Sequence, residues 1–353
     1  MKARRPWAWP LVPLYAGALA VKEMLRRMGW TRVLTLRWPV VSVGSLSAGG
    51  AGKTPVVMAL ATLLRERGHH VDVLSRGYGR DASHKHLPAQ VMPQMEDAAA
   101  RFGDEPTLIA QRTEAPVWVG RDRFSSGTTA ENFAKEPPFR FERPMLGPPL
   151  ATSGIHLLDD GFQHRRLART VDIALVTAED LDDALLPAGN RREPFAALQR
   201  ADIVVIREEE RESVEARVTP LMREGTLLWG VHRRLRFPAP LGVLSAGLRP
   251  LAFCAIARPE GFAAMLQHAG CGVLETVAFR DHHAYTLSDI DQVLVVAERL
   301  QASGFVTTEK DAVKLSPVLR AQLEMVGPVV VVALEAEFVY PERVARELEA
   351  RLV

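Results

Sequence analysis

Residues 47–55, SAGGAGKTP, contain the residue types that cradle nucleotide phosphates. Glycines let successive backbone N–H groups turn toward one anion, and a helix that begins at the lysine adds positive potential. The lysine would contact the β- and γ-phosphates, and the threonine hydroxyl would bind Mg²⁺. The first glycine of the usual G-x-x-x-x-G-K-[ST] pattern is a serine here, so a Gly-rich structural turn is the alternative. We expect a nucleotide-binding loop formed by Ser47, Ala48, Gly49, Gly50, Ala51, Gly52, Lys53 and Thr54.

Two adjacent acids follow an apolar run in IHLLDDGFQH, residues 155–164. A phosphate loop works with a carboxylate at the end of a neighbouring strand, which orients Mg²⁺. Burying a carboxylate at the end of a buried strand costs free energy unless a cation pairs with it. Asp159 and Asp160 are therefore predicted metal-site residues, with a capping turn before Gly161 as the alternative.

A second acidic pair, Asp104 and Glu105, lies in FGDEP, where a strand-to-helix loop would bring it to the same sheet edge. N-cap or first-turn positions are the ordinary alternative for both acids. In DHHAY, residues 281–285, the aspartate would orient an imidazole, which would tune a carboxylate across the cleft. Solvated loop histidines are the alternative, and the residues alone do not distinguish His282 from His283.

Alternating strand and helix patterns would position these groups on one sheet. Strand-like apolar runs occupy residues 39–44, 71–74, 117–119, 155–158, 172–176 and 202–206, and a helical pattern follows the glycines. This order predicts an α/β fold with a P-loop NTPase-like, doubly wound, mostly parallel sheet. After a boundary near residues 238–250, a second alternating unit predicts a smaller α/β domain.

Composition narrows the function classes. The chain has 353 residues, of which 47% are hydrophobic, so two domains with large cores are expected. Lys and Arg number 44 against 42 Asp and Glu, which argues against nucleic acid as a partner. The two cysteines, Cys254 and Cys271, form no C-x-x-C pair, which is typical of a reducing compartment, and the histidine spacing predicts no zinc site.

The first 30 residues combine a basic start, an apolar run over residues 7–21 and a second basic cluster. The run is shorter than the roughly 20 residues that a spanning helix needs. Tryptophans and flanking basic residues favour a helix that lies on an anionic membrane surface. A helix packed on the core of the protein itself is the alternative.

The motifs together resemble one family. VGSLSAGGAGKTP, SRGYGR, GDEP, VGRDR, LLDDGFQH, LLPAGNRREP, ARPEGF, DHHAYT and TTEKDAVKL occur in this order in the tetraacyldisaccharide 4′-kinases, the lipid A 4′-kinases. The resemblance covers about residues 40–315, and serine or threonine is usual in that family at the position of Ser47. It implies a membrane-associated enzyme on the cytoplasmic face of the bacterial inner membrane. The implied reaction transfers the γ-phosphate of ATP to the 4′-hydroxyl of an acylated glucosamine disaccharide 1-phosphate, which yields lipid IVA.

Site roles follow from the same resemblance. Asp104 matches the proposed catalytic carboxylate, a histidine of DHH matches the residue that assists it, and Lys53 matches the lysine of the phosphate loop. Thr54, Asp159, Asp160 and Glu105 match positions near Mg²⁺. Arg76 and Arg192 match positions suited to anionic ligands, and basic residues after strand ends suit phosphate groups in general.

We expect three ranges with distinct tasks: a membrane-associated helix over residues 1–30, a P-loop kinase domain over 31–240, and an α/β domain over 241–353 that closes over the site. Residues 124–154 are rich in Pro, Gly and Ser, and they predict a long surface loop where the family has a regular helix. The alternative function is a membrane-surface P-loop ATPase that acts as a switch. It would share the phosphate loop and not require Asp104 or DHH.

Overall fold

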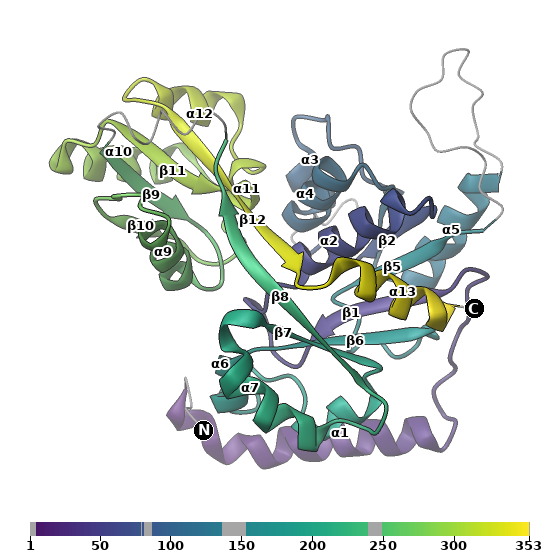
Figure 1. Cartoon of the computed structure of the whole chain (residues 1–353). Coiled ribbons are helices and arrows are strands. Elements are labelled where there is room, and N and C mark those ends of the chain that lie inside the picture. Colours follow the sequence, from purple (N-terminus) through teal and green to yellow (C-terminus); the bar gives the residue numbers. More distant parts are fainter. Residues whose placement is uncertain (1–4, 79, 81–86, 136–152, 239–248, 353) are drawn as a thin grey trace. The chain divides into compact units, whose positions relative to one another are not determined.

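The computed structural model describes residues 5–78, 80, 87–135, 153–238 and 249–352. It is a mixed α/β structure with mostly parallel strands, and the chain divides into two compact units (Figure 1). Unit 1 comprises residues 1–76, 115–232 and 336–353, and unit 2 comprises residues 77–114 and 233–335. This division differs from the continuous ranges expected from the sequence, because residues 77–114 group with the C-terminal part of the chain.

Unit 1 holds a parallel sheet whose strands run in the order β8-β7-β6-β1-β5-β2-β4. Five of these strands are buried at every residue, which explains why they appear as apolar runs in the sequence: β1, β2, β5, β6 and β7. The strands are β1 (Val40–Ser45), β2 (Val71–Ser75), β4 (Val117–Val119), β5 (Ile155–Asp159), β6 (Val171–Val176), β7 (Ile203–Arg207) and β8 (Leu227–Arg236), the last of which continues into unit 2.

The helices of unit 1 include the one that opens the chain and the one that closes it. They are η1 (Pro6–Leu11), α1 (Val12–Arg27), α2 (Lys53–Glu66), α5 (Arg123–Lys135), α6 (Ala178–Asp182), η3 (Phe195–Arg200), η4 (Glu208–Glu210), α7 (Arg211–Val218), η5 (Thr219–Leu221) and α13 (Pro341–Leu352). Every helix in the described ranges is too short or too polar to cross a membrane.

Unit 2 has its own parallel strands, in the order β10-β9-β11-β12. A core that includes Phe253, Phe305, Tyr285 and Ile290 packs α10 against them. Its elements are β3 (Ala89–Gln90), α3 (Ala98–Phe102), α4 (Asp104–Thr113), β9 (Pro250–Cys254), α9 (Pro259–His268), β10 (Thr276–Ala278), α10 (Leu287–Leu300), β11 (Gly304–Thr308), α11 (Glu309–Ala312), α12 (Pro317–Glu324) and β12 (Val329–Phe338), which returns to unit 1.

The expectation of a loop from residue 124 onward is wrong for its first part, where α5 forms. The buried face of α5 is small and polar, so it lacks the apolar periodicity that predicts a helix. Gly127 packs against Leu36, and the buried Glu131 accepts hydrogen bonds from the backbone N–H groups of Arg37 and Trp38 at 2.8 and 2.9 Å. Residues 136–152 of the expected loop, and most of the expected boundary at 238–250, lie outside the described residues.

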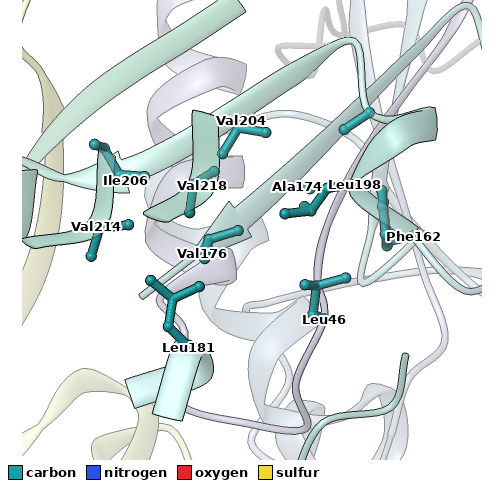
Figure 2. Close-up of a cluster of buried hydrophobic side chains, with 11 residues drawn as sticks. Leu46, Phe162, Ala174, Val176, Leu181, Leu198, Val204, Ile206, Val214 and Val218 are labelled. Carbon is teal, nitrogen blue, oxygen red and sulfur yellow. The ribbon is translucent and has the colours of Figure 1, made fainter. Parts of the chain in front are cut away.

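One core cluster of unit 1 reaches the phosphate loop directly (Figure 2). Leu46 immediately precedes the loop and Phe162 follows the acidic pair, and both are fully buried in this cluster with side chains of β6, β7 and α7. The same hydrophobic contacts therefore hold the start of the loop and the end of the acidic turn.

A single methyl group tests this coupling. In Gly44→Ala, the new Cβ would lie 2.5 Å from the Cβ of Phe162 and 2.7 Å from its backbone nitrogen. We expect a loss of about 1–3 kcal/mol in the free energy of unfolding, because the close-packed backbone has to move. Urea unfolding followed by circular dichroism measures it.

Gly17→Ala is the matched control, because a Cβ at Gly17 in α1 meets nothing within 4 Å. Alanine favours a helix over glycine by up to about 1 kcal/mol, so this variant is expected to be neutral or slightly stabilised. Equal unfolding midpoints for Gly44→Ala and the wild type would contradict the packing argument.

Candidate functional site

The phosphate loop connects β1 to α2, whose first residue is Lys53. Gly49, Gly50 and Gly52 have φ of 70°, 69° and 89°, in the left-handed region that glycine enters without strain. These turns and the N-terminus of α2 create the anion-binding environment expected from the sequence. The loop residues predicted to bind nucleotide are thus brought together at one end of β1.

Hydrogen bonds fix the backbone of this loop. The backbone N–H of Ala48 donates to the carbonyl of Asn190 at 2.9 Å, and the Ser45 hydroxyl donates to the carbonyl of Ser47 at 2.8 Å. The guanidinium of Arg207 donates to the carbonyl of Gly50 at 3.1 Å. Sequence reasoning missed Arg207, although an arginine directly after the apolar run at residues 202–206 was the available signal.

The two acids of DDGFQH have different environments. Asp159 ends β5, is 3% exposed, and accepts a hydrogen bond from the Ser75 hydroxyl at 2.9 Å. Asp160 has φ of 48° and pairs with Lys53 at 3.4 Å and Arg192 at 2.8 Å. Burial raises the pKa of Asp160, but the charges of Lys53 and Arg192 outweigh it, so the pKa is lowered. Asp160 therefore holds two cations beside the loop.

The donor set of unit 1 fits a magnesium ion bound together with a nucleotide. In phosphate-loop enzymes, one hydroxyl, one strand-end aspartate and the phosphate oxygens hold the ion. Thr54 and Asp159 supply the first two, and all three donor types are hard oxygens. The described residues contain no cluster of three His, Cys, Asp or Glu side chains able to hold a metal alone. Asp160 and Glu105 each form ion pairs with side-chain cations, so their roles as ligands stay predictions.

The two arginines expected to meet anions have unlike surroundings. Arg76 is exposed directly after β2. Arg192 donates to Asp160 and, at 3.3 Å, to the side-chain oxygen of Gln163. Its backbone carbonyl accepts a hydrogen bond from Tyr15 of α1 at 2.9 Å, which ties the N-terminal helix to this side of the loop.

Arg123 is a third arginine near the acidic pair. It is 5% exposed at the start of α5. Burial lowers its pKa to about 10, while Asp159 and Asp160 act in the opposite direction. The guanidinium therefore stays charged at neutral pH, next to the acids. VGRDR indicated a basic strand end, but only the fold shows which of its arginines is buried.

Asp104 and His282 contact each other within unit 2. Asp104 is the first residue of α4 and is 6% exposed. The Nδ1 atom of His282 lies 2.9 and 3.1 Å from its two carboxylate oxygens. This pair was expected to bridge two domains, but both residues belong to one unit, so their contact needs no movement between units. His282 has φ of 61°, a strained value that is characteristic of functional sites.

His283 faces a different partner. Its Nε2 lies 3.0 Å from Asp289, and its ring stacks on Phe279 with centroids 5.3 Å apart. The sequence left the choice between the two histidines open. The geometry places His282, and not His283, against Asp104.

Neighbouring charges keep Asp104 ionised. Burial raises its pKa. The hydrogen bond from His282 and the charge of Lys310 lower the pKa by more than burial raises it, so the pKa lies below the usual range. Burial and the charge of Lys310 lower the pKa of His282, but the hydrogen bond to Asp104 and the charges of Asp104 and Asp281 together outweigh them, so the pKa is raised. Gly103 before the acid has φ of 100°, and a Cβ there would lie 2.7 Å from the carbonyl of Tyr78. Glycine is therefore required for Asp104 to begin α4.

Comparison with known proteins decides the family. The protein-family model described as LpxK, tetraacyldisaccharide-1-P 4′-kinase, matches residues 4–353 of this chain. The chain belongs to this family. Two tetraacyldisaccharide 4′-kinases illustrate the relation. The protein from Koribacter versatilis is 39% identical, covering 87% of this chain and 88% of the relative. The protein from Geobacter metallireducens is 37% identical, and the match covers 86% of this chain and 87% of that relative.

A solved structure of the family has the same fold. LpxK from Aquifex aeolicus in complex with ATP is 28% identical, with 98% of each chain covered and a TM-score of 0.73. The resemblance inferred from the motifs is thereby confirmed. The tetraacyldisaccharide 4′-kinase family is an ATP-dependent kinase family of lipid A biosynthesis, and the switch ATPase is not favoured for this member.

Removal of the imidazole of His282 is expected to change the pKa of Asp104. In His282→Gly, glycine adopts the φ of 61° without strain and the imidazole is removed. The pKa of Asp104 then rises, because a lowering hydrogen bond is lost while burial remains. A carboxylate accepts a proton only when ionised, so the acidic limb of the kinase pH–rate profile moves to higher pH. The rate at neutral pH falls by about 100-fold or more.

His283→Gly is the matched control, because its imidazole pairs with Asp289 and not with Asp104. Its acidic limb is expected at the wild-type position. Initial rates measured across the pH range of the folded protein provide both comparisons. A wild-type limb in His282→Gly would contradict the assignment.

Proposed function

We propose that the chain transfers the γ-phosphoryl group of ATP to the 4′-hydroxyl of a tetraacylated glucosamine disaccharide 1-phosphate, which yields lipid IVA. The observation that carries this proposal is the buried Asp104–His282 pair, since a kinase acting on an alcohol needs an ionised acceptor for the hydroxyl proton. ATP hydrolysis by a switch protein would not require such a pair.

In the proposed reaction, Lys53 and the loop amides contact the β- and γ-phosphates. Asp104 accepts the proton of the 4′-hydroxyl while the hydroxyl oxygen forms a bond to the γ-phosphorus. The bond from that phosphorus to the β–γ bridging oxygen breaks, and ADP leaves with the electron pair. His282 orients Asp104 through its Nδ1 hydrogen bond. Arg76 and Arg192 are proposed to contact the anionic groups of ATP or of the acceptor.

Thr54 and Asp159 are the residues proposed to hold Mg²⁺, which neutralises phosphate charge when bound. We assign the sheet of unit 1 to the P-loop NTPase-like, doubly wound class, and residues 241–353 to a smaller α/β domain. We keep the division of tasks expected from the sequence, in which residues 1–30 dock on the membrane, residues 31–240 bind ATP and residues 241–353 close over the substrates, except that residues 77–114 group with unit 2 and residues 336–353 with unit 1. Closure would exclude water and restrain hydrolysis.

The N-terminal helix is proposed to dock on the cytoplasmic face of the bacterial inner membrane, where the acylated acceptor resides. Three apolar side chains of α1 and one at its C-cap, all at helical spacing, are at least half exposed: Leu14, Val21, Met24 and Met28. Trp7 and Trp30 are exposed near its two ends, as suits a membrane interface. The exposed apolar surface supports peripheral attachment, and it distinguishes α1 from a helix whose apolar face is buried.

Two substitutions separate nucleotide binding from proton transfer. Lys53→Ala is expected to weaken ATP binding and to lower turnover by at least about 100-fold, because phosphate charge is no longer neutralised. Asp104→Asn keeps the shape of the side chain and is expected to lower kcat by roughly 10²–10⁴-fold with little change in ATP affinity. Mass spectrometry of the lipid product and ATP titration measure the two effects.

Lys135→Ala and Asp97→Asn are the matched controls, since both residues are exposed and lie in units 1 and 2 respectively. They should retain wild-type turnover. Acceptor-independent ATP hydrolysis with no phosphorylated lipid, unaffected by Asp104→Asn, would overturn the kinase proposal.

Membrane docking has its own test. Leu14 and Val21 are 70% and 52% exposed, and the double variant Leu14→Glu with Val21→Glu places two charges in the docking surface. Burial of an apolar side chain contributes about 1.5–3 kcal/mol, so binding to vesicles with anionic lipids should weaken by at least ten-fold. Co-sedimentation measures it.

Val295→Glu with Val318→Glu is the control, because these side chains are 66% and 63% exposed on other helices and the charge change is the same. Vesicle binding of this control should match the wild type. Equal vesicle binding by the two double variants would contradict the assignment of α1 to the membrane-docking surface.

A further inference from the structure

Lys310 has been described so far only through its charge, which lowers the pKa of Asp104, but its ammonium group also lies against the imidazole of His282. Its Nζ atom is 2.9 Å from Glu105, 3.3 Å from Asp281 and 3.4 Å from the Nε2 atom of His282. Its side chain is only 18% exposed. All of these groups belong to unit 2.

The two nitrogens of His282 therefore face opposite kinds of partner. Nδ1 lies 2.9 Å from the carboxylate of Asp104, which only accepts hydrogen bonds when ionised. Nε2 lies 3.4 Å from an ammonium group, which only donates. The one neutral tautomer that satisfies both contacts carries its proton on Nδ1.

The neighbouring carboxylate of Asp281 raises the pKa of His282 and so opposes this preference, but it lies farther from Nε2 than the ammonium does. Asp281 lies 3.7 Å from Nε2, beyond ordinary hydrogen-bond distance, and its other oxygen accepts from Lys310 at 3.3 Å. Among the described residues, Tyr78, whose ring centroid is 5.0 Å from the imidazole, and Lys314, whose charge acts on Asp104, also lie near this pair.

Lys310 is held in place by a buried support. It lies on the single-turn helix α11, where Thr308 caps the helix and donates to Asp311 at 2.6 Å. Asp311 is fully buried, and it also accepts hydrogen bonds from the backbone N–H of Ala255 and from the hydroxyl of Tyr285. Tyr285 closes the DHHAY segment, so one carboxylate ties α11 to the loop that carries His282.

We propose that Lys310 is a positioning residue that holds His282 in the Nδ1-protonated tautomer, with that proton directed at Asp104. Its catalytic consequence rests on the proposed function of the Asp104–His282 pair. The motif TTEKDAVKL thereby supplies both the cation and, through Asp311, the support that positions it.

The test is Lys310→Met, read by ¹⁵N NMR of histidine-labelled protein, because protonated and unprotonated ring nitrogens have distinct shifts. The signal of His282 is assigned by its loss in His282→Gln. In Lys310→Met the ammonium no longer opposes a proton on Nε2, so we expect the single Nδ1-protonated form to give way to the doubly protonated imidazolium, with a fall of roughly 10–100-fold in kcat. The KM for ATP should stay within about two-fold, since the phosphate loop is unchanged. Lys310→Arg retains a donor and should restore the tautomer and part of kcat.

Arg112→Met is the matched control. Arg112 also joins α4 to α11, through Glu309 at 3.2 Å, but it does not touch His282. If Lys310 and Arg112 only stabilised the fold, Lys310→Met and Arg112→Met would lower the free energy of unfolding similarly and have the same effect on the His282 signal and on kcat. The control is expected to keep the wild-type NMR signal of His282.

An unchanged Nδ1-protonated signal in Lys310→Met would overturn the proposal, whatever the rate. A changed signal with wild-type kcat would support the role of Lys310 as a positioning residue, and would instead contradict the part assigned to His282 in the proposed function. The two failures are therefore distinguishable.

Discussion

Ionisation of a buried carboxylate is the constraint on which unit 2 depends. Asp104 is almost entirely withdrawn from water, and burial alone would favour its neutral form. The imidazole of His282 and the ammonium of Lys310 reverse that preference, and the N-terminus of α4 adds positive potential at the same point. Gly103, the strained backbone of His282 and the buried Asp311 are means of assembling these partners around one side chain.

Unit 1 solves a related problem at the phosphate loop. Cations gather there for the phosphates of a nucleotide, and Asp160 balances two of them. Asp160, like His282, has positive φ. Asp160 turns the chain directly after the buried strand β5, and His282 turns it in the partly exposed segment after β10, so that in each case a polar side chain faces its partners. At these two positions, a strained backbone coincides with the convergence of side chains of opposite charge.

Much of this arrangement was readable in the sequence, because buried parallel strands appear as apolar runs and glycines mark the phosphate loop. Local patterns could not show that residues 77–114 group with the C-terminal part of the chain, since the contacts are long-range. Helix α5 was missed because its buried face carries glycine, serine and a glutamate instead of large apolar side chains. The choice of His282 over His283 and the contacts of Lys310 depend on side-chain directions that spacing alone does not determine.

The separation of Asp104 from His282 by 178 positions has a consequence for biosynthesis. At roughly 5–20 residues per second, the ribosome delivers the histidine on the order of 10–40 seconds after the acid. During that interval the nascent segment carries a carboxylate whose imidazole and ammonium neighbours have not yet been synthesised. Unit 2 therefore cannot mature while the chain is half made. A product truncated before α11 would retain the phosphate loop, Asp104 and His282 but lack the ammonium of Lys310.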